Sequence, residues 1–194
     1  MKVSFIKSLF EKVKLLEAEE MIRRYFVMNG FDGILTVLGI LIGSYISENI
    51  NPPLIINITL TSGIAMFISG FFGAYIAERA ERLKEIRELE RALLKPLKNS
   101  VLEEAVLTVT IIVGIVDGSS PLIVSLVIIV PFFLGLSPLL AFYISLSIAL
   151  ILLFLMGLYL GKISKEHIIL SAIRMVAIGI LCIFLMLLVK PLPP

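Results

Sequence analysis

The sequence is short of the residues that build most soluble active sites. It contains one cysteine, one histidine and no tryptophan, and only 16% of its residues are charged. A single cysteine, Cys182, excludes an intrachain disulfide and a cysteine-based zinc site. A single histidine, His167, excludes a multi-histidine metal site within one chain. The net charge of +2 is too small to indicate nucleic acid as a partner.

Hydrophobic residues make up 59% of the 194-residue chain, and its mean hydropathy is +1.07. The few charges are segregated, because residues 25–77 contain only Asp32 and Glu48 as charged groups and residues 105–161 contain only Asp117. Apolar runs of about 18 residues or more are typical of membrane-spanning helices. We therefore expect an all-α, multi-pass integral membrane protein in the lipid bilayer, which excludes a soluble enzyme.

The apolar runs and the Pro- and Gly-containing turns between them predict five transmembrane helices. The third run is long enough for two short spans, but each would have about a dozen residues and rise only ~18 Å, less than a ~30 Å hydrocarbon core. One interrupted helix is therefore favoured there. The expected spans are 25–46, 54–77, 104–134, 138–161 and 167–189.

The basic residues predict the orientation of these spans. Of the 17 Lys and Arg residues, six precede the first span, seven lie between the second and third, and three lie around the connection between the fourth and fifth. Only Lys190 falls on the opposite side. Because cytoplasmic loops are enriched in Lys and Arg, we expect a cytoplasmic N-terminus. In a prokaryote, the protein would lie in the cell membrane.

Three segments organise the chain. Residues 1–22 have apolar residues at helical spacing and predict an amphipathic helix in the cytoplasmic interface. Residues 23–194 form the five-helix membrane domain. Within it, residues 78–103 are rich in Glu and Arg and predict a cytoplasmic helical hairpin insert.

Two pairs of short motifs indicate an internal repeat. Asp32-Gly33 in the first span matches Asp117-Gly118 in the third, and Gly73-Ala74-Tyr75 matches Gly157-Leu158-Tyr159 at the ends of the second and fourth. The paired landmarks are 41 residues apart in the first copy and 40 in the second. This spacing favours a parallel duplication of a helical hairpin, as found in some transporters, over chance identity in a glycine-rich chain.

Asp32 and Asp117 are the candidate functional residues inside the membrane. A carboxylate at such depth costs at least ~2.5 kcal/mol on insertion scales and is a functional candidate by default. Residues 117–121 (Asp-Gly-Ser-Ser-Pro) predict a helix stop and restart, and residues 29–33 a milder break. Paired interruptions in matching spans indicate a transporter's binding site. The alternative is that each aspartate only caps its own break.

A second group of carboxylates lies on the expected cytoplasmic side. Glu81, Glu85 and Glu88 follow Glu78 at intervals of three, four and three, which places them on one face of a helix. Glu103 and Glu104 stand at the start of the third span, where a hairpin would bring them near that face. Carboxylate oxygens suit manganese, iron(II) or magnesium. The alternative is a solvated helix whose acids pair with the interleaved arginines.

These motifs resemble the vacuolar iron transporter family. Arg24, residues 29–33 (Asn-Gly-Phe-Asp-Gly) and Thr36 are similar to that family's first span, and residues 69–77 to the end of its second, before a Glu-rich helix. The resemblance covers nearly the whole chain. The family's Gly-Glu-Tyr is here Gly73-Ala74-Tyr75, and the cytoplasmic insert is short, so the chain resembles a compact, divergent branch.

The resemblance implies a homodimer that exchanges divalent iron or manganese for protons, with no resident cofactor and no enzymatic activity. It implies that Asp32 is the intramembrane carboxylate, that Glu85 and Glu88 are the first cytoplasmic ligands, and that Glu103 or Glu104 is the acid at the start of the third span. The full candidate metal set is Asp32, Glu81, Glu85, Glu88, Glu103, Glu104 and Asp117.

Two other function classes compete with a transporter. Two intramembrane aspartates are also needed by a membrane aspartyl protease, but Gly114-Ile115-Val116-Asp117 lacks the Gly-x-Gly-Asp spacing of presenilin-like proteases. A non-transporting membrane scaffold or partner subunit would need neither aspartate for flux, and neutralising Asp32 would then change only stability.

Overall fold

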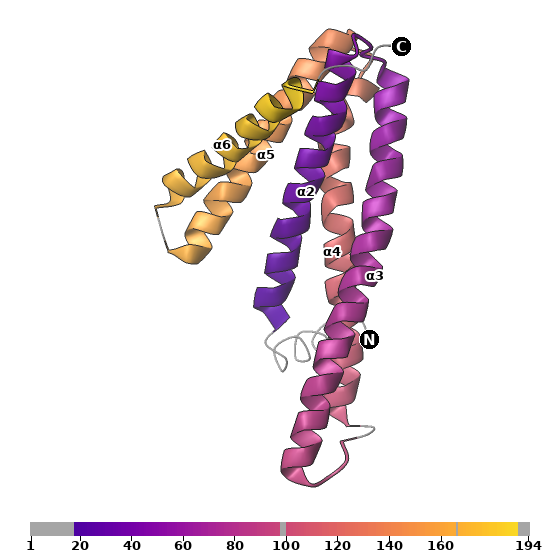
Figure 1. Cartoon of the computed structure of the whole chain (residues 1–194), viewed down its shortest axis with the longest axis vertical. Coiled ribbons are helices and arrows are strands. Elements are labelled where there is room, and N and C mark those ends of the chain that lie inside the picture. The colour runs from indigo at the N-terminus through magenta and orange to yellow at the C-terminus, as the bar shows by residue number, and fades with distance from the viewer. Residues whose placement is uncertain (1–17, 98–99, 166, 190–194) are drawn as a thin grey trace. The chain divides into compact units, whose positions relative to one another are not determined.

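The computed structural model describes residues 18–97, 100–165 and 167–189, and all of the regular structure in these ranges is α-helical. Five helices follow one another (Figure 1), and each is long and apolar enough to cross a membrane. This confirms the expected all-α fold with five candidate spans. The helices are α2 (Ala18–Ile46), α3 (Pro52–Leu93), α4 (Val101–Phe133), α5 (Pro138–Ser164) and α6 (Ile168–Leu187).

The helix bounds agree with the expected spans at most ends, and the differences have local causes. Helix α3 continues past the apolar run to Leu93, because residues 78–93 are mostly Glu, Arg, Leu and Ala, which are good helix formers. Helix α2 begins at Ala18, so it takes in the last part of the segment 1–22. The rest of that segment, residues 1–17, lies outside the described residues.

The expected interruption at residues 117–121 is wrong, because α4 runs unbroken from Val101 to Phe133 with two prolines inside it. The milder break expected at residues 29–33 is likewise absent from α2. Proline is tolerated in membrane helices where neighbouring helices and hydroxyl side chains replace the missing backbone interactions. Around Pro121, the Ser120 hydroxyl donates to the Phe26 carbonyl of α2 at 2.6 Å, and the Ser125 hydroxyl donates to the Pro121 carbonyl at 2.7 Å. The first bond ties this turn of α4 to α2.

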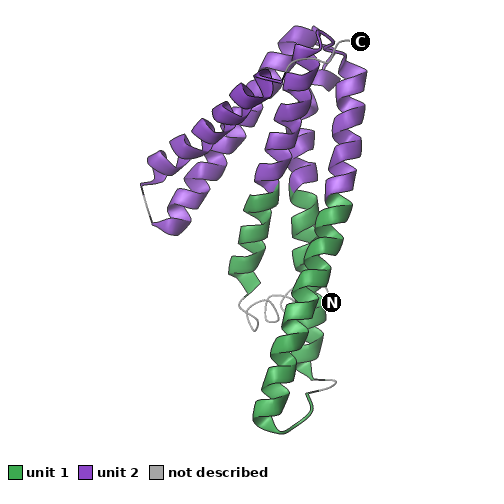
Figure 2. Cartoon of the chain, viewed as in Figure 1, with its two compact units in different colours: residues 1–29, 67–120 green, residues 30–66, 121–194 purple. Residues whose placement is uncertain are grey.

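The chain divides into two compact units (Figure 2), residues 1–29 with 67–120, and residues 30–66 with 121–194. We call them unit 1 and unit 2. Helices α2, α3 and α4 contribute residues to both. The most apolar windows of α4 and α2 are 50% and 44% buried, against 11% for α6. Helices α2 and α4 therefore offer the most shelter from lipid for a polar side chain.

Each unit has its own apolar core. In unit 1, Ala18, Ala74, Val109 and Val113 are buried, and Met21, Ile22 and Tyr25 pack against them. In unit 2, the core is larger and joins α2 to α5 through Ile34, Leu38, Leu41, Phe142 and Leu153 among others. Helices α5 and α6 lie side by side there (Figure 1), since a Cβ on Gly157 would stand 2.5 Å from the Ala172 Cα.

Candidate functional site

The carboxylate of Asp117, in unit 1, is buried, with only 5% of the residue exposed. The side-chain amide of Asn29, on α2, donates a hydrogen bond to its Oδ1 atom. The same amide nitrogen lies 3.4 Å from the Tyr25 carbonyl one turn earlier. On the α3 side, a Cβ built on Gly70 would stand 3.0 Å from the Asp117 Oδ2 atom. Three helices therefore meet around this carboxylate.

Helices α3 and α4 reach this closeness through glycine. A Cβ on Gly118 would stand 2.5 Å from the Phe67 carbonyl oxygen, and one on Gly114 would stand 2.9 Å from the Phe71 carbonyl oxygen. Small residues of this kind let two helix backbones approach closely in a membrane. The close approach places α3 backbone directly beside Asp117, where a larger side chain would otherwise separate the helices.

A second polar contact joins the same helices nearer the charged end of α3. The Tyr25 hydroxyl donates a hydrogen bond to the Glu78 Oε1 atom at 2.9 Å. The Arg24 guanidinium carbon lies 5.8 Å from the centre of the Tyr25 ring, within the range of a cation–π interaction. Tyr25 and Asn29 are four residues apart, so they lie on one face of α2. That face therefore presents two polar groups to α3 and α4.

Asp32 has different surroundings from Asp117. Its side chain is exposed on the surface of the single chain, and the described contact of the residue is through its backbone, whose carbonyl accepts a 2.8 Å hydrogen bond from the Thr36 hydroxyl. The next residue, Gly33, is buried, and a Cβ on it would stand 2.7 Å from the Pro121 Cα. The backbone at this point of α2 is thus packed on α4, while the carboxylate points outward.

The candidate carboxylates on the charged part of α3, residues 78–93, are exposed, and two of them lie beside basic residues. The Glu85 carboxylate lies 2.9 Å from an Arg82 nitrogen, and the Glu81 carboxylate lies 3.4 Å from the Lys84 nitrogen. Glu88 is exposed as well. Exposed ion pairs of this kind contribute about 0–1 kcal/mol, so they hold the carboxylates weakly.

Glu103 and Glu104 lie in the first turn of α4, where the backbone N–H of Glu103 donates to the Ser100 hydroxyl oxygen at 3.3 Å. Among the described residues, no three His, Cys, Asp or Glu side chains are grouped so that they could hold a metal ion. One chain therefore does not gather the seven candidate ligands into a single site.

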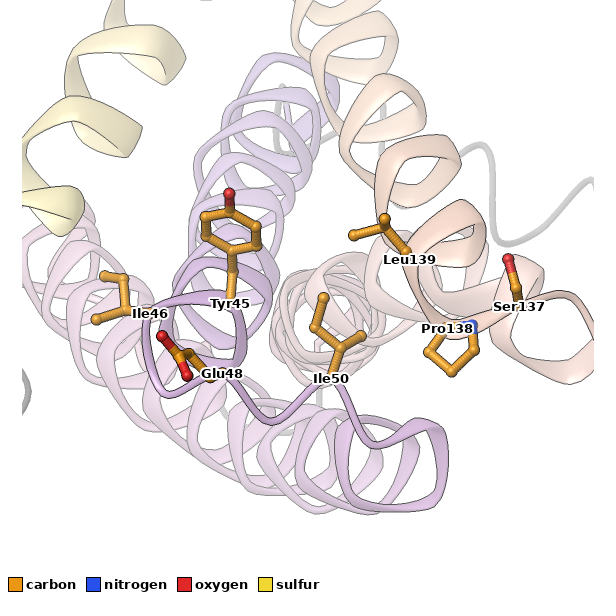
Figure 3. A pocket seen from close by; sticks show the side chains of 7 residues that line it. All are labelled: Tyr45, Ile46, Glu48, Ile50, Ser137, Pro138 and Leu139. Atoms are coloured by element: carbon orange, nitrogen blue, oxygen red, sulfur yellow. The ribbon is translucent and has the colours of Figure 1, made fainter. Parts of the chain in front are cut away.

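Unit 2 contains an open pocket of about 600 Å³ at the α2–α3 and α4–α5 connections. Figure 3 shows Tyr45 and Leu139 in it, with the Glu48 carboxylate on the α2–α3 connection. The Tyr45 ring stacks on Phe142, with 5.3 Å between ring centres. Glu48 has a positive φ of 51°, which few residues other than glycine adopt.

Sequence reasoning missed the partners of the buried carboxylate. It treated Asn29 as part of a helix break and Glu78 as one member of the acidic face. A signal was present, since Tyr25 and Asn29 are spaced by four and so are Gly70, Ala74 and Glu78. Spacing of four places residues on one helix face, but it does not show which faces meet.

The chain is 39% identical, over 166 residues, to the uncharacterized protein MJ0645 of Methanocaldococcus jannaschii. The aligned region covers 82% of this chain and 85% of that protein. The chain belongs to the same family as that protein. No model of a known protein family matches it. No solved structure matches it.

Proposed function

We propose that this relative of the Methanocaldococcus jannaschii protein is a secondary transporter of the vacuolar iron transporter type. It moves a divalent metal cation, iron(II) or manganese, across the membrane in exchange for protons. The observation that carries the proposal is the buried carboxylate of Asp117, hydrogen-bonded by Asn29 inside a candidate membrane span. Such a group costs at least ~2.5 kcal/mol to insert and is rarely kept without a function.

Exchange follows from the chemistry of a carboxylate. A carboxylate binds either a proton or a metal cation, so one must leave before the other binds. The Asn29 amide supports both forms, because it offers N–H donors to the ionised acid and a carbonyl acceptor to the protonated one. Asp117, and Asp32 in the matching position of the first span, then alternate between the proton and the metal.

A homodimer accounts for the exposed Asp32. An ionised side chain facing hydrocarbon is costly, and a second copy of the chain removes that cost by covering the α2 face. The second copy also brings further carboxylates to the site, since one chain groups no three of them among its described residues. In this arrangement, α2 from each copy lines the path.

The parallel duplication and the cytoplasmic N-terminus belong to the same proposal. Gly33 and Gly118 each follow an aspartate, and both stand at close helix contacts, with Cβ distances of 2.7 Å and 2.5 Å to the nearest backbone atom. These equivalent roles support a repeated hairpin. With a cytoplasmic N-terminus, residues 78–93 of α3 also lie in the cytoplasm. The exposed carboxylates of this segment then attract cations to the entrance.

Uptake by purified protein in liposomes tests the proposal. With a pH gradient across the membrane, we expect iron(II) or manganese uptake accompanied by proton movement in the opposite direction. Asp117→Ala and Asp32→Ala are expected to abolish both fluxes, while Glu48→Ala, which removes an exposed acid from the α2–α3 connection, retains them. Equal metal and proton fluxes in the wild type and both aspartate variants would contradict the transporter.

A further inference from the structure

In unit 1, one layer of apolar side chains separates Asp117 from the charged end of α3. Asp117 itself is level with Gly70. One and two turns outward on the same faces, Ala74 packs with Val113 and Val109. One turn beyond Ala74, Glu78 accepts the hydrogen bond from Tyr25. The Glu78 carboxylate thus lies at the outer side of an apolar layer.

The apolar layer is closed. Ala18, Val109 and Val113 have no exposed surface, and Ala74 has 4%. Tyr25 packs on these residues with its ring, while its hydroxyl reaches Glu78. A hydrated cation does not fit through side chains in van der Waals contact, so this layer has to open before any ion reaches Asp117 from this end.

We propose that the hydrogen bond between Tyr25 and Glu78 is the latch that holds this layer closed, and that a divalent cation opens it by binding the Glu78 carboxylate. The inference rests on the proposed function, because it assigns the gate of that transport site. The cation takes the carboxylate oxygen that accepts the Tyr25 hydroxyl. The hydroxyl then donates to water, and the ring is released from α3.

The chemistry of the pair suits a latch. A hydroxyl-to-carboxylate hydrogen bond is stronger than one between neutral groups. The pair is only partly buried, so water satisfies both groups when they separate, and the open state is not prohibitive. A fully buried pair would be harder to separate, because its opening would leave a buried charge without a partner.

Thiol accessibility tests the latch without measuring transport. In a Cys182→Ala background, Val113→Cys places a nearly isosteric thiol in the closed layer. The thiol reacts with a charged, membrane-impermeant methanethiosulfonate reagent, and the rate of this reaction is measured first without metal. The protein is present in the vesicles in both orientations, so that the reagent meets each side of the membrane. Val109→Cys serves as a second reporter, and thermal unfolding of each variant in detergent shows that it is folded.

We expect slow reaction in the latched protein and about tenfold faster reaction in Tyr25→Phe and in Glu78→Ala, which each remove a charge-assisted hydrogen bond. Tyr25→Phe combined with Glu78→Ala reacts no faster than either change alone. Two controls are expected to leave the labelling rate unchanged. Tyr75→Phe removes another tyrosine hydroxyl from α3, and Glu81→Ala removes an exposed acid from the same helix. Manganese accelerates the reaction in the latched protein but not in Glu78→Ala.

The results separate this proposal from the transporter itself. Equal labelling rates with Tyr25 and Glu78 intact and with either one substituted would overturn the latch. Fast labelling of the protein in which both residues are intact would also overturn it. No response to manganese would overturn opening by the ion. Faster labelling of the Tyr25→Phe protein together with zero metal uptake by the wild type would support the latch and end the transport proposal.

Discussion

Asn29 of α2 donates a hydrogen bond to the buried carboxylate of Asp117 of α4, a residue 88 positions further along the chain. This contact joins the first and third candidate spans inside unit 1. An amide side chain can follow a change of protonation, because it carries both a donor and an acceptor. The pair is therefore both a structural link and the centre of the proposed exchange site.

Exchanging the two side chains tests whether this hydrogen bond stabilises the protein. Asn29→Asp alone places two carboxylates together and is expected to lower the free energy of unfolding by about 1–3 kcal/mol. Adding Asp117→Asn restores an amide–carboxylate pair and recovers most of that loss. Chemical unfolding in detergent measures both. Asn49→Asp, in the exposed α2–α3 connection, is the control and should change little.

The outcome of the double variant decides the interpretation. The double variant, Asn29→Asp with Asp117→Asn, is compared with Asn29→Asp alone. If both have the same free energy of unfolding, the direct hydrogen bond does not contribute to stability, and Asn29 stabilises the protein only by filling space.

The close contacts of Gly33 and Gly118 predict the effect of added methyl groups. Gly33→Ala and Gly118→Ala direct a Cβ onto backbone atoms at 2.7 Å and 2.5 Å, and each should lower stability by about 1–3 kcal/mol. Gly43→Ala and Gly73→Ala meet no atom within 4 Å, and they should be neutral or stabilising by up to about 1 kcal/mol, since alanine favours helix. Melting temperatures in detergent compare the four variants. A loss for all four, or for none, would contradict the packing.

The sequence predicts the fold better than it predicts the site. Five apolar runs are enough to place five helices, because only helices satisfy their own backbone in lipid. The prediction at Pro121 is wrong because a local rule for proline predicts a helix break there. In the structure α4 continues through this point, where it packs on Gly33 of α2 and bonds the Phe26 carbonyl through Ser120. The contacts of Asn29 and Glu78 depend on which helix faces meet, and spacing within one helix carries no information about that.

Asp32 predicts where two copies of the chain meet. In a Cys182→Ala background, Asp32→Cys should form disulfide-linked dimers in membranes under mild oxidation, because the proposed dimer covers this face of α2. Leu155→Cys is the matched control, since Leu155 is 52% exposed on α5 and suits lipid without a partner. Gel electrophoresis without reductant measures the linked fraction. Equal linking at both positions would indicate random collision, and linking only at Leu155 would place the interface on α5.

The exposed acids of α3 predict a concentration effect on transport. Neutralising them with Glu85→Gln and Glu88→Gln should raise the metal concentration needed for half-maximal uptake several-fold and leave the maximal rate unchanged, because surface carboxylates gather cations near the entrance. The effect should shrink at high salt, because the screening length of exposed charges falls from about 10 Å at 0.1 M to about 3 Å at 1 M. Uptake rates over a range of metal concentrations separate the two parameters.

A charge-matched control distinguishes a local effect from a global one. Glu19→Gln with Glu20→Gln removes two exposed acids from the first turn of α2 and changes the net charge by the same amount. If this pair raises the half-maximal concentration as much, the effect belongs to net surface charge and the α3 face has no special role. If neutralising Glu85 and Glu88 lowers the maximal rate instead, these carboxylates take part in the transport step itself, as metal ligands on the path and not as a gathering surface.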